Sequence, residues 1–192
     1  MNEIPDLNEV RRRLAQEGTS TTRSKPEEVG EDLAHLVWET FSDEVSDPAF
    51  LTLLTRLEAP LVDGLPGERV TEELLIFLLW IHTRAVQLAF QGRSDATEVR
   101  RLLDALHRAV FEDMVRHGTP EGRLPLFEQR VAVRYTEYGA AAEESDLQVG
   151  HMAAGLLSGR GEDIPEGLAK ALANRAIALA GPLQDFLGEV QL

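Results

Sequence analysis

The chain repeats apolar residues at helical spacing over most of its length. The strongest pattern runs from about Val70 to Gln91 and holds the segment Leu74-Leu75-Ile76-Phe77-Leu78-Leu79-Trp80-Ile81. In the second half of this pattern only Thr83, Arg84 and Gln87 interrupt the apolar surface. Because such a helix is apolar nearly all the way round, it must be surrounded by other helices or by a partner. The sequence therefore predicts a central apolar helix.

Capping and turn residues divide the rest of the chain into further helices. The expected N-terminal caps are Ser24 with Glu27, Asp47 before Pro48, Thr71 before Glu72 and Glu73, Asp95 with Glu98, Ser145-Asp146, and Asp163 with Glu166. The expected helix ends are Pro60, Gly92, His117-Gly118-Thr119-Pro120, Gly159-Arg160-Gly161 and Gly181-Pro182. The short linker after Gln91 indicates that residues 70–114 form an antiparallel helical hairpin.

Two segments are less regular. Leu61 to Arg69 has turn chemistry, with Asp63-Gly64 and Pro66-Gly67. A helix is expected from Phe127 to about Glu144, although the alternation in Val131-Ala132-Val133 leaves a strand open as the alternative. These patterns together predict an all-α, single-domain multi-helix bundle of about six to eight helices around the central apolar helix.

The expected domain organisation is a short arm followed by one domain. Residues 1–25 form the N-terminal arm, in which Asp6 to Glu17 can make a short charged helix before a polar linker. Residues 26–192 form the helical domain, and a chain of 192 residues is long enough to bury a sizeable core.

Composition narrows the choice of partners. The formal net charge of -14 repels phosphate backbones and anionic lipid head groups, so we expect no nucleic acid partner and at most peripheral contact with membranes. The longest unbroken apolar run is eight residues, against roughly 20 for a membrane span. The start of the chain lacks the features of a secretory signal, and cysteine is absent. These features predict a cytoplasmic protein.

No catalytic signature occurs in the sequence, and no cofactor is implied. Asp104 and His107 stand three residues apart on one helix face, but carboxylate-bridged metal bundles need a second such pair. The row Glu31, His35 and Glu39 has helical spacing and is expected to be a solvated face. We therefore predict no metal site, with these two groups as the open alternatives.

Two other features invite a chemical interpretation. Ser158-Gly159 lacks the Gly-x-Ser-x-Gly context of a nucleophile elbow and is expected to end a helix. A lone histidine on the central helix, His82, is expected to be a core residue.

A series of short motifs runs from about Ser46 to Glu144. In chain order they are Asp47-Pro48-Ala49-Phe50, Asp63-Gly64 with Arg69, Leu74 through Trp80 with Arg84, Phe111-Glu112-Asp113-Met114, and Arg130-Val131 with Tyr135 and Tyr138. This order resembles the ubiquinol–cytochrome c chaperone family, the all-helical assembly factors of respiratory complex III. Leu168 to Arg175 suits the final helix of that family.

The resemblance implies a non-catalytic function. A chaperone of this kind would hold a newly made, strongly apolar cytochrome b polypeptide until its haems and partner subunits arrive. The client would lie in a partly apolar groove lined by Trp80, Arg84, Phe111 and Met114. Two alternatives stay open: a metal-binding or small-ligand-binding bundle, and an acidic interaction or scaffold protein that self-associates as a homodimer through its apolar helix.

Overall fold

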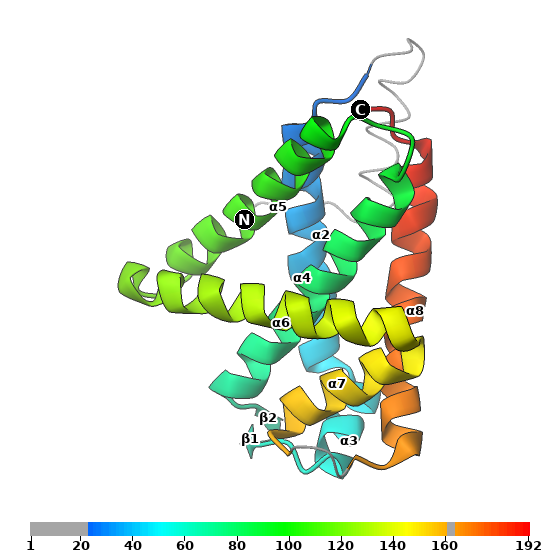
Figure 1. Cartoon of the computed structure of the whole chain (residues 1–192). Helices are drawn as coiled ribbons and strands as arrows, with labels where there is room; N and C mark the ends of the chain where they lie inside the picture. Colours follow the sequence, from blue (N-terminus) through cyan, green and yellow to red (C-terminus); the bar gives the residue numbers. More distant parts are fainter. Residues whose placement is uncertain (1–22, 161–163) are drawn as a thin grey trace. The chain divides into compact units, whose positions relative to one another are not determined.

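The computed structural model describes residues 23–160 and 164–192, and this part of the chain is almost entirely helical (Figure 1). It contains seven α-helices: α2 (Pro26–Ser46), α3 (Pro48–Arg56), α4 (Glu68–Phe90), α5 (Ala96–Arg116), α6 (Leu124–Glu144), α7 (Asp146–Ser158) and α8 (Glu166–Glu189). The remaining elements are the 3-10 helix η1 (Glu121–Arg123) and the strands β1 (Leu61–Val62) and β2 (Leu65–Pro66). The predicted all-α class is confirmed. The expected helix at Asp6–Glu17 and the cap at Asp163 lie outside the described residues.

The described helices fall into two compact units. The first unit comprises residues 23–40, 82–124 and 181–192, and the second comprises residues 41–81, 125–160 and 164–180. The division lies inside α2, α4 and α8, so each of these helices contributes to both units. The expectation of one domain over residues 26–192 stays a prediction.

The first unit packs α2 closely against α5. A Cβ atom built on Gly30 would lie 2.4 Å from the backbone oxygen of Leu102 and 2.8 Å from the Cβ atom of Ala105, so only glycine permits this approach. The guanidinium of Arg93 donates to the backbone oxygens of Leu187, Gly188 and Val190, which fixes the end of α8 beside the α4–α5 turn. The core side chains of this unit are Val29, Leu33, Leu36, Val37, Val86, Phe90, Leu102, Leu106, Val110, Leu183, Phe186 and Leu187.

The second unit holds the apolar first half of α4. Its core side chains are Phe50, Leu54, Leu57, Val70, Leu74, Ile76, Phe77, Leu78, Leu79, Phe127, Tyr138, Val149, Leu157, Leu168 and Leu172. Arg175 of α8 donates to Glu44 and Asp47, and its guanidinium lies 5.1 Å from the ring centre of Phe50. Burial raises the pKa of Glu44, whereas the bond from Arg175 lowers the pKa of Asp47. These contacts join α2, α3 and α8 within the unit.

The segment between α3 and α4 is a miniature hairpin. Val62 pairs with Leu65, and the two residues between them, Asp63 and Gly64, have φ angles of 51° and 80°. Two consecutive positive φ angles are typical of the tightest hairpin turns, which favour Asp-Gly. The predicted turn is therefore present, with two short strands that the sequence analysis did not anticipate.

Several predicted helix boundaries are confirmed. The side chains of Asp47, Asp95 and Ser145 accept hydrogen bonds from the backbone N–H groups of Ala49, Thr97 and Gln148. These bonds satisfy donors that a helix start leaves unpaired. In the segment Val131–Val133 the strand alternative is wrong, because these residues lie inside α6.

Three predicted boundaries are wrong. Helix α2 begins at Pro26 and not after a Ser24 cap, because proline fits the first helical position. Helix α4 begins at Glu68, so Thr71 lies in its first turn and its hydroxyl donates to the Pro66 oxygen at 3.2 Å. Gly181-Pro182 does not end α8. Beyond Pro182, burial of Leu183, Phe186 and Leu187 offsets the hydrogen bond that proline removes.

Among the described helices, α4 is long and apolar enough by composition to cross a membrane. However, 78% of its most apolar window is buried inside the protein. A core helix of a soluble protein passes the same test. The predicted central apolar helix is confirmed as a mostly buried helix.

Candidate functional site

The four predicted partner-binding residues differ in exposure. Trp80 and Met114 are each only 8% exposed, Phe111 is half-buried and Arg84 is exposed. Trp80 belongs to the second unit and the other three to the first. Contact between a client and all four side chains would therefore require Trp80 and Met114 to be uncovered. The assignment of these residues to a client groove stays a prediction.

Each of the two candidate metal-binding groups contains a residue that makes another contact. His107 is half-buried and its Nδ1 atom lies 2.7 Å from the backbone oxygen of Leu103, whereas Asp104 is exposed. Glu31 lies 3.9 Å from a guanidinium nitrogen of Arg108. Within residues 23–160 and 164–192, no group of three or more His, Asp or Glu side chains is arranged to hold a metal ion.

His107 should make stability depend on pH. Burial lowers its pKa, against the opposing effects of the Leu103 carbonyl and Asp104. Because burial favours the neutral His107 ring in the folded state, the contribution of this ring to stability is complete above the pKa of about 6.5 that it has in the unfolded chain. It is lost as the pH falls from there towards the folded pKa. When the pH falls from 7.5 to 5, we expect the free energy of unfolding of His107→Gln to decrease less than that of the unmodified protein. Urea denaturation at both pH values measures the two decreases.

The exposed His35 provides the matched control for this experiment. His35→Gln removes an exposed histidine of α2 and is measured over the same pH range. An unchanged pH dependence in His107→Gln would contradict the prediction.

The second unit contains a cleft. It has a volume of about 930 Å³ and lies between the first half of α4, the second half of α6, and α7. Its apolar lining consists of Ala140, Ala141, Met152, Gly155, Leu156, Gly159 and Ile164. Its polar lining consists of Arg69, Glu73, Arg134, Glu137, Glu144, Gln148, His151 and Arg160.

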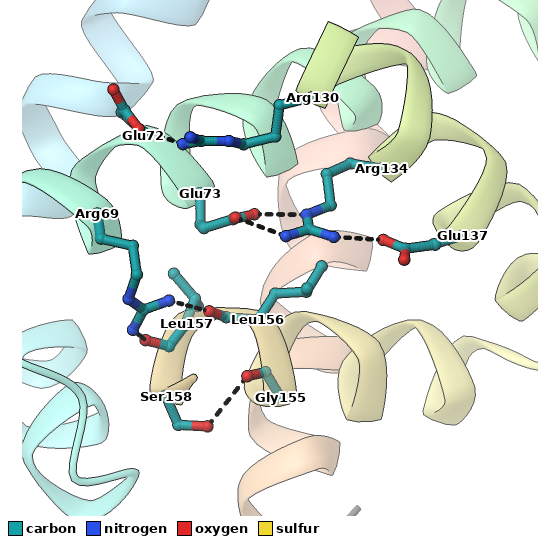
Figure 2. A network of polar contacts seen from close by, with 10 residues as sticks. All are labelled: Arg69, Glu72, Glu73, Arg130, Arg134, Glu137, Gly155, Leu156, Leu157 and Ser158. Atoms are coloured by element: carbon teal, nitrogen blue, oxygen red, sulfur yellow. Dashed lines mark hydrogen bonds and ion pairs between the residues drawn. The ribbon is translucent and has the colours of Figure 1, made fainter. Parts of the chain in front are cut away.

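An ion-pair network runs along one wall of the cleft (Figure 2). The Arg134 guanidinium binds both carboxylate oxygens of Glu73 at 2.9 Å each and a Glu137 oxygen at 2.8 Å. Glu73 is only 3% exposed, so this two-point contact compensates a buried charge. The hydrogen bonds that Arg134 donates to Glu73 raise the pKa of Arg134 above its already high ordinary value. Arg130 also pairs with Glu72, one turn further from the cleft.

Arg69 lies beside the C-terminal end of α7, on the same side of the cleft as Glu73 (Figure 2). Its guanidinium donates to the backbone oxygens of Leu156 and Leu157 at 2.5 and 2.7 Å, which are carbonyls that the end of α7 leaves unpaired. Gly159 follows with φ 71°, and a Cβ atom there would lie 3.2 Å from an Arg69 nitrogen. The position requires glycine for its backbone angle and for the space that Arg69 occupies.

Ser158 takes part in the same helix end. Its hydroxyl donates to the Ala154 oxygen at 2.7 Å, and Ser158 is only 7% exposed. The expectation that Ser158-Gly159 ends a helix is confirmed, because Gly159 is the left-handed C-terminal cap of α7.

An aromatic cluster adjoins the network through Tyr138, which interacts electrostatically with Glu73, Arg134 and Glu137. The Tyr138 ring lies 5.3 Å from the Phe77 ring and 5.1 Å from the Trp80 ring, measured between centres. The Tyr138 hydroxyl is buried and has no hydrogen-bond partner among the described residues. Burial raises the pKa of Tyr138 well above its ordinary value, so the phenol stays neutral.

Several charged side chains that line the cleft are engaged with other parts of the protein. The Glu73, Arg134 and Glu137 side chains hold one another, and Arg69 holds the end of α7. The described lining residues include no Ser, Thr, Cys or Lys side chain that could act as a nucleophile. On α7 the cleft is also lined by the polar side chains of Gln148 and His151.

None of the residue patterns in the sequence predicted this cleft. Arg134 and Glu137 are spaced for an ion pair on one helix face, but such pairs are common on solvated helices. No local pattern marks the cleft, because its lining residues come from α4, α6 and α7, which are far apart in the chain. Comparison of the chain with protein-family models, with curated proteins and with solved structures gives no match.

Proposed function

We propose that this chain is a non-catalytic, chaperone-like assembly factor that holds an apolar helical segment of a client protein in the cleft of its second unit. The observation that carries the proposal is the open cleft of about 930 Å³ with a floor of small and flexible apolar side chains. Alanine and glycine allow close approach of a helix, and methionine adapts its shape to different partners.

The charged side chains that line the cleft balance one another, which favours an uncharged occupant over a cation. The cleft has three guanidinium groups and three carboxylates among its lining residues, Arg69, Arg134 and Arg160 against Glu73, Glu137 and Glu144. The whole chain, by contrast, has a formal net charge of -14. The cleft is thus a balanced region of an acidic protein, and burial of apolar surface would supply most of the binding free energy.

The resemblance to the ubiquinol–cytochrome c chaperone family suggests the nature of the client. A client of that kind is a newly made, strongly apolar polypeptide, which needs cover until it is assembled. Within this proposal the protein acts in the cytoplasm, and Trp80, Arg84, Phe111 and Met114 stay a predicted partner-binding set, none of which lines the cleft.

Binding of a defined helical peptide tests the proposal. The probe is a fluorescein-labelled, lactam-stapled peptide of about 14 residues, with Leu and Ala on one face and Gln on the other, which matches about four helical turns. Met152 is half-buried in the cleft, so Met152→Glu places a charge on its floor. We expect fluorescence anisotropy to show micromolar binding to the full chain and at least tenfold weaker binding to Met152→Glu.

Ile177→Glu is the matched control. Ile177 is 51% exposed on α8 and does not line the cleft, so this variant should bind like the unmodified protein. Circular dichroism checks that both variants are folded. Absence of peptide binding to the unmodified protein, or equal binding to Met152→Glu, would refute the proposal.

A further inference from the structure

Helix α8 (Glu166–Glu189) presents a largely uncharged face to solvent. At about 100° per residue, exposed positions that recur every three or four residues fall on one side of a helix. On α8 these positions are Lys170, Asn174, Ile177, Ala178, Gly181 and Asp185. Ile177, at the middle of this face, is a large apolar side chain that is 51% exposed. All of these residues belong to one continuous helix, so helical geometry fixes their spacing.

The α8 face differs in charge from the chain as a whole. The formal net charge of -14 makes two copies of this chain repel each other. No Asp or Glu occurs between Gly167 and Gln184, so two copies that met along α8 would have no carboxylate at the centre of their contact. The apolar window of α4, by contrast, is 78% buried inside the protein. The α8 face is therefore a surface on which this acidic chain can meet a second copy of itself.

The two charged side chains of the α8 face are placed symmetrically. Lys170 lies seven residues before Ile177, and Asp185 lies seven residues after Ala178. Neither charged side chain has a hydrogen-bond or ion-pair partner among the described residues. If two α8 helices lie antiparallel with a two-fold axis between Ile177 and Ala178, each Lys170 lies opposite Asp185 of the partner subunit. A parallel pair would bring equal charges together, so the charges select the antiparallel arrangement.

Gly181 is consistent with a close approach on this face. It lies inside α8, where glycine is less favourable than alanine. A Cβ atom built on Gly181 would meet no atom within 4 Å outside the backbone of its own helix, so no contact inside the chain accounts for glycine there. In the antiparallel pair Gly181 lies opposite Asn174 of the partner subunit. The missing side chain lets the two helices approach each other closely.

We infer that two copies of this chain associate through antiparallel contact of their α8 faces. Ile177 packs beside Ala178 of the partner subunit at the centre, and an ion pair between Lys170 and Asp185 of the partner subunit forms at each end. A single pair of helices is a small interface, so we expect a reversible dimer with a Kd of roughly 10–100 µM. No residue of α8 lines the cleft, so this inference does not depend on the proposed function.

Charge reversal at the two ends tests the inference. Sedimentation velocity over a range of concentrations around the expected Kd measures association of the unmodified protein, Lys170→Glu and Asp185→Lys. Each variant alone brings equal charges together at both ends of the contact, so we expect association to weaken about tenfold or more. An equimolar mixture of the two variants restores an opposite-charge pair at both ends. We expect this mixture to form heterodimers with about the affinity of the unmodified protein.

Two controls make the same changes in net charge elsewhere. Arg100→Glu and Glu112→Lys alter exposed positions of α5 and should associate like the unmodified protein. Circular dichroism checks that all four variants are folded. Ile177→Glu should also weaken association, because it places a carboxylate at the centre of the contact in both copies, while peptide binding in the cleft stays unchanged.

Three results would overturn the inference. The first is an unmodified protein that stays monomeric at about ten times the expected Kd. The second is unchanged association of Lys170→Glu and Asp185→Lys, which would mean that the copies meet on another face. The third is a mixture of these two variants that associates as weakly as each variant alone, which would contradict the antiparallel pairing.

Discussion

Gly150→Ala is expected to lower the free energy of unfolding by about 3 kcal/mol or more, as measured by urea denaturation. A Cβ atom at this position would lie 2.0 Å from the backbone oxygen of Ala169 and 2.9 Å from the backbone nitrogen of Ala173. Both neighbouring atoms are backbone, so no side-chain rotation relieves the clash. Helices α7 and α8 would have to move apart, which would also displace the cleft wall that α7 forms.

Gly139→Ala is the matched control for this prediction. Gly139 lies inside α6, and a Cβ atom there would have no neighbour within 4 Å. Alanine favours the helical backbone over glycine, so this variant should be more stable by roughly 0.5–1 kcal/mol. A Gly150→Ala variant within about 1 kcal/mol of the unmodified protein would show that the close approach of α7 and α8 is not required.

Local signals in the sequence predicted the helices well. Asp47, Asp95 and Ser145 each cap the helix that the sequence assigned to them, because a cap needs only a side-chain oxygen two or three residues before a free N–H group. The apolar run from Leu74 to Ile81 also predicted its own burial. These features depend on residues close together in the chain.

Features that depend on distant residues were not predicted. Gly181-Pro182 reads as a helix end, yet α8 continues because the residues beyond it are buried in the first unit. The cleft depends on Arg69 meeting α7 at positions 87 and 88 residues away, which no local pattern indicates. In the same way, burial of Trp80 and Met114 follows from packing by other helices, and exposure could not be read from their helical spacing.

Arg134→Leu is expected to lower the free energy of unfolding by about 2–4 kcal/mol, measured by urea denaturation. The reason is the environment of Glu73, whose carboxylate is nearly inaccessible to water and is held at both oxygens by Arg134. Removal of Arg134 leaves this carboxylate buried without its counter-ion. Glu137 is more accessible and regains water when Arg134 is lost, so it contributes little to the effect.

A second substitution separates charge from packing. Glu73→Gln in the Arg134→Leu background removes the stranded charge, and we expect it to restore at least half of the lost free energy of unfolding. Arg130→Leu is the control, because its partner Glu72 is more exposed than Glu73, and it should lose less than about 1 kcal/mol. If Glu73→Gln restores nothing, the stability of this wall comes from packing of the Arg134 side chain against the cleft and not from compensation of the buried carboxylate. In that case Arg134→Leu and the double variant Arg134→Leu with Glu73→Gln should also bind the helical peptide equally weakly. Both variants lack the Arg134 side chain that shapes this wall of the cleft.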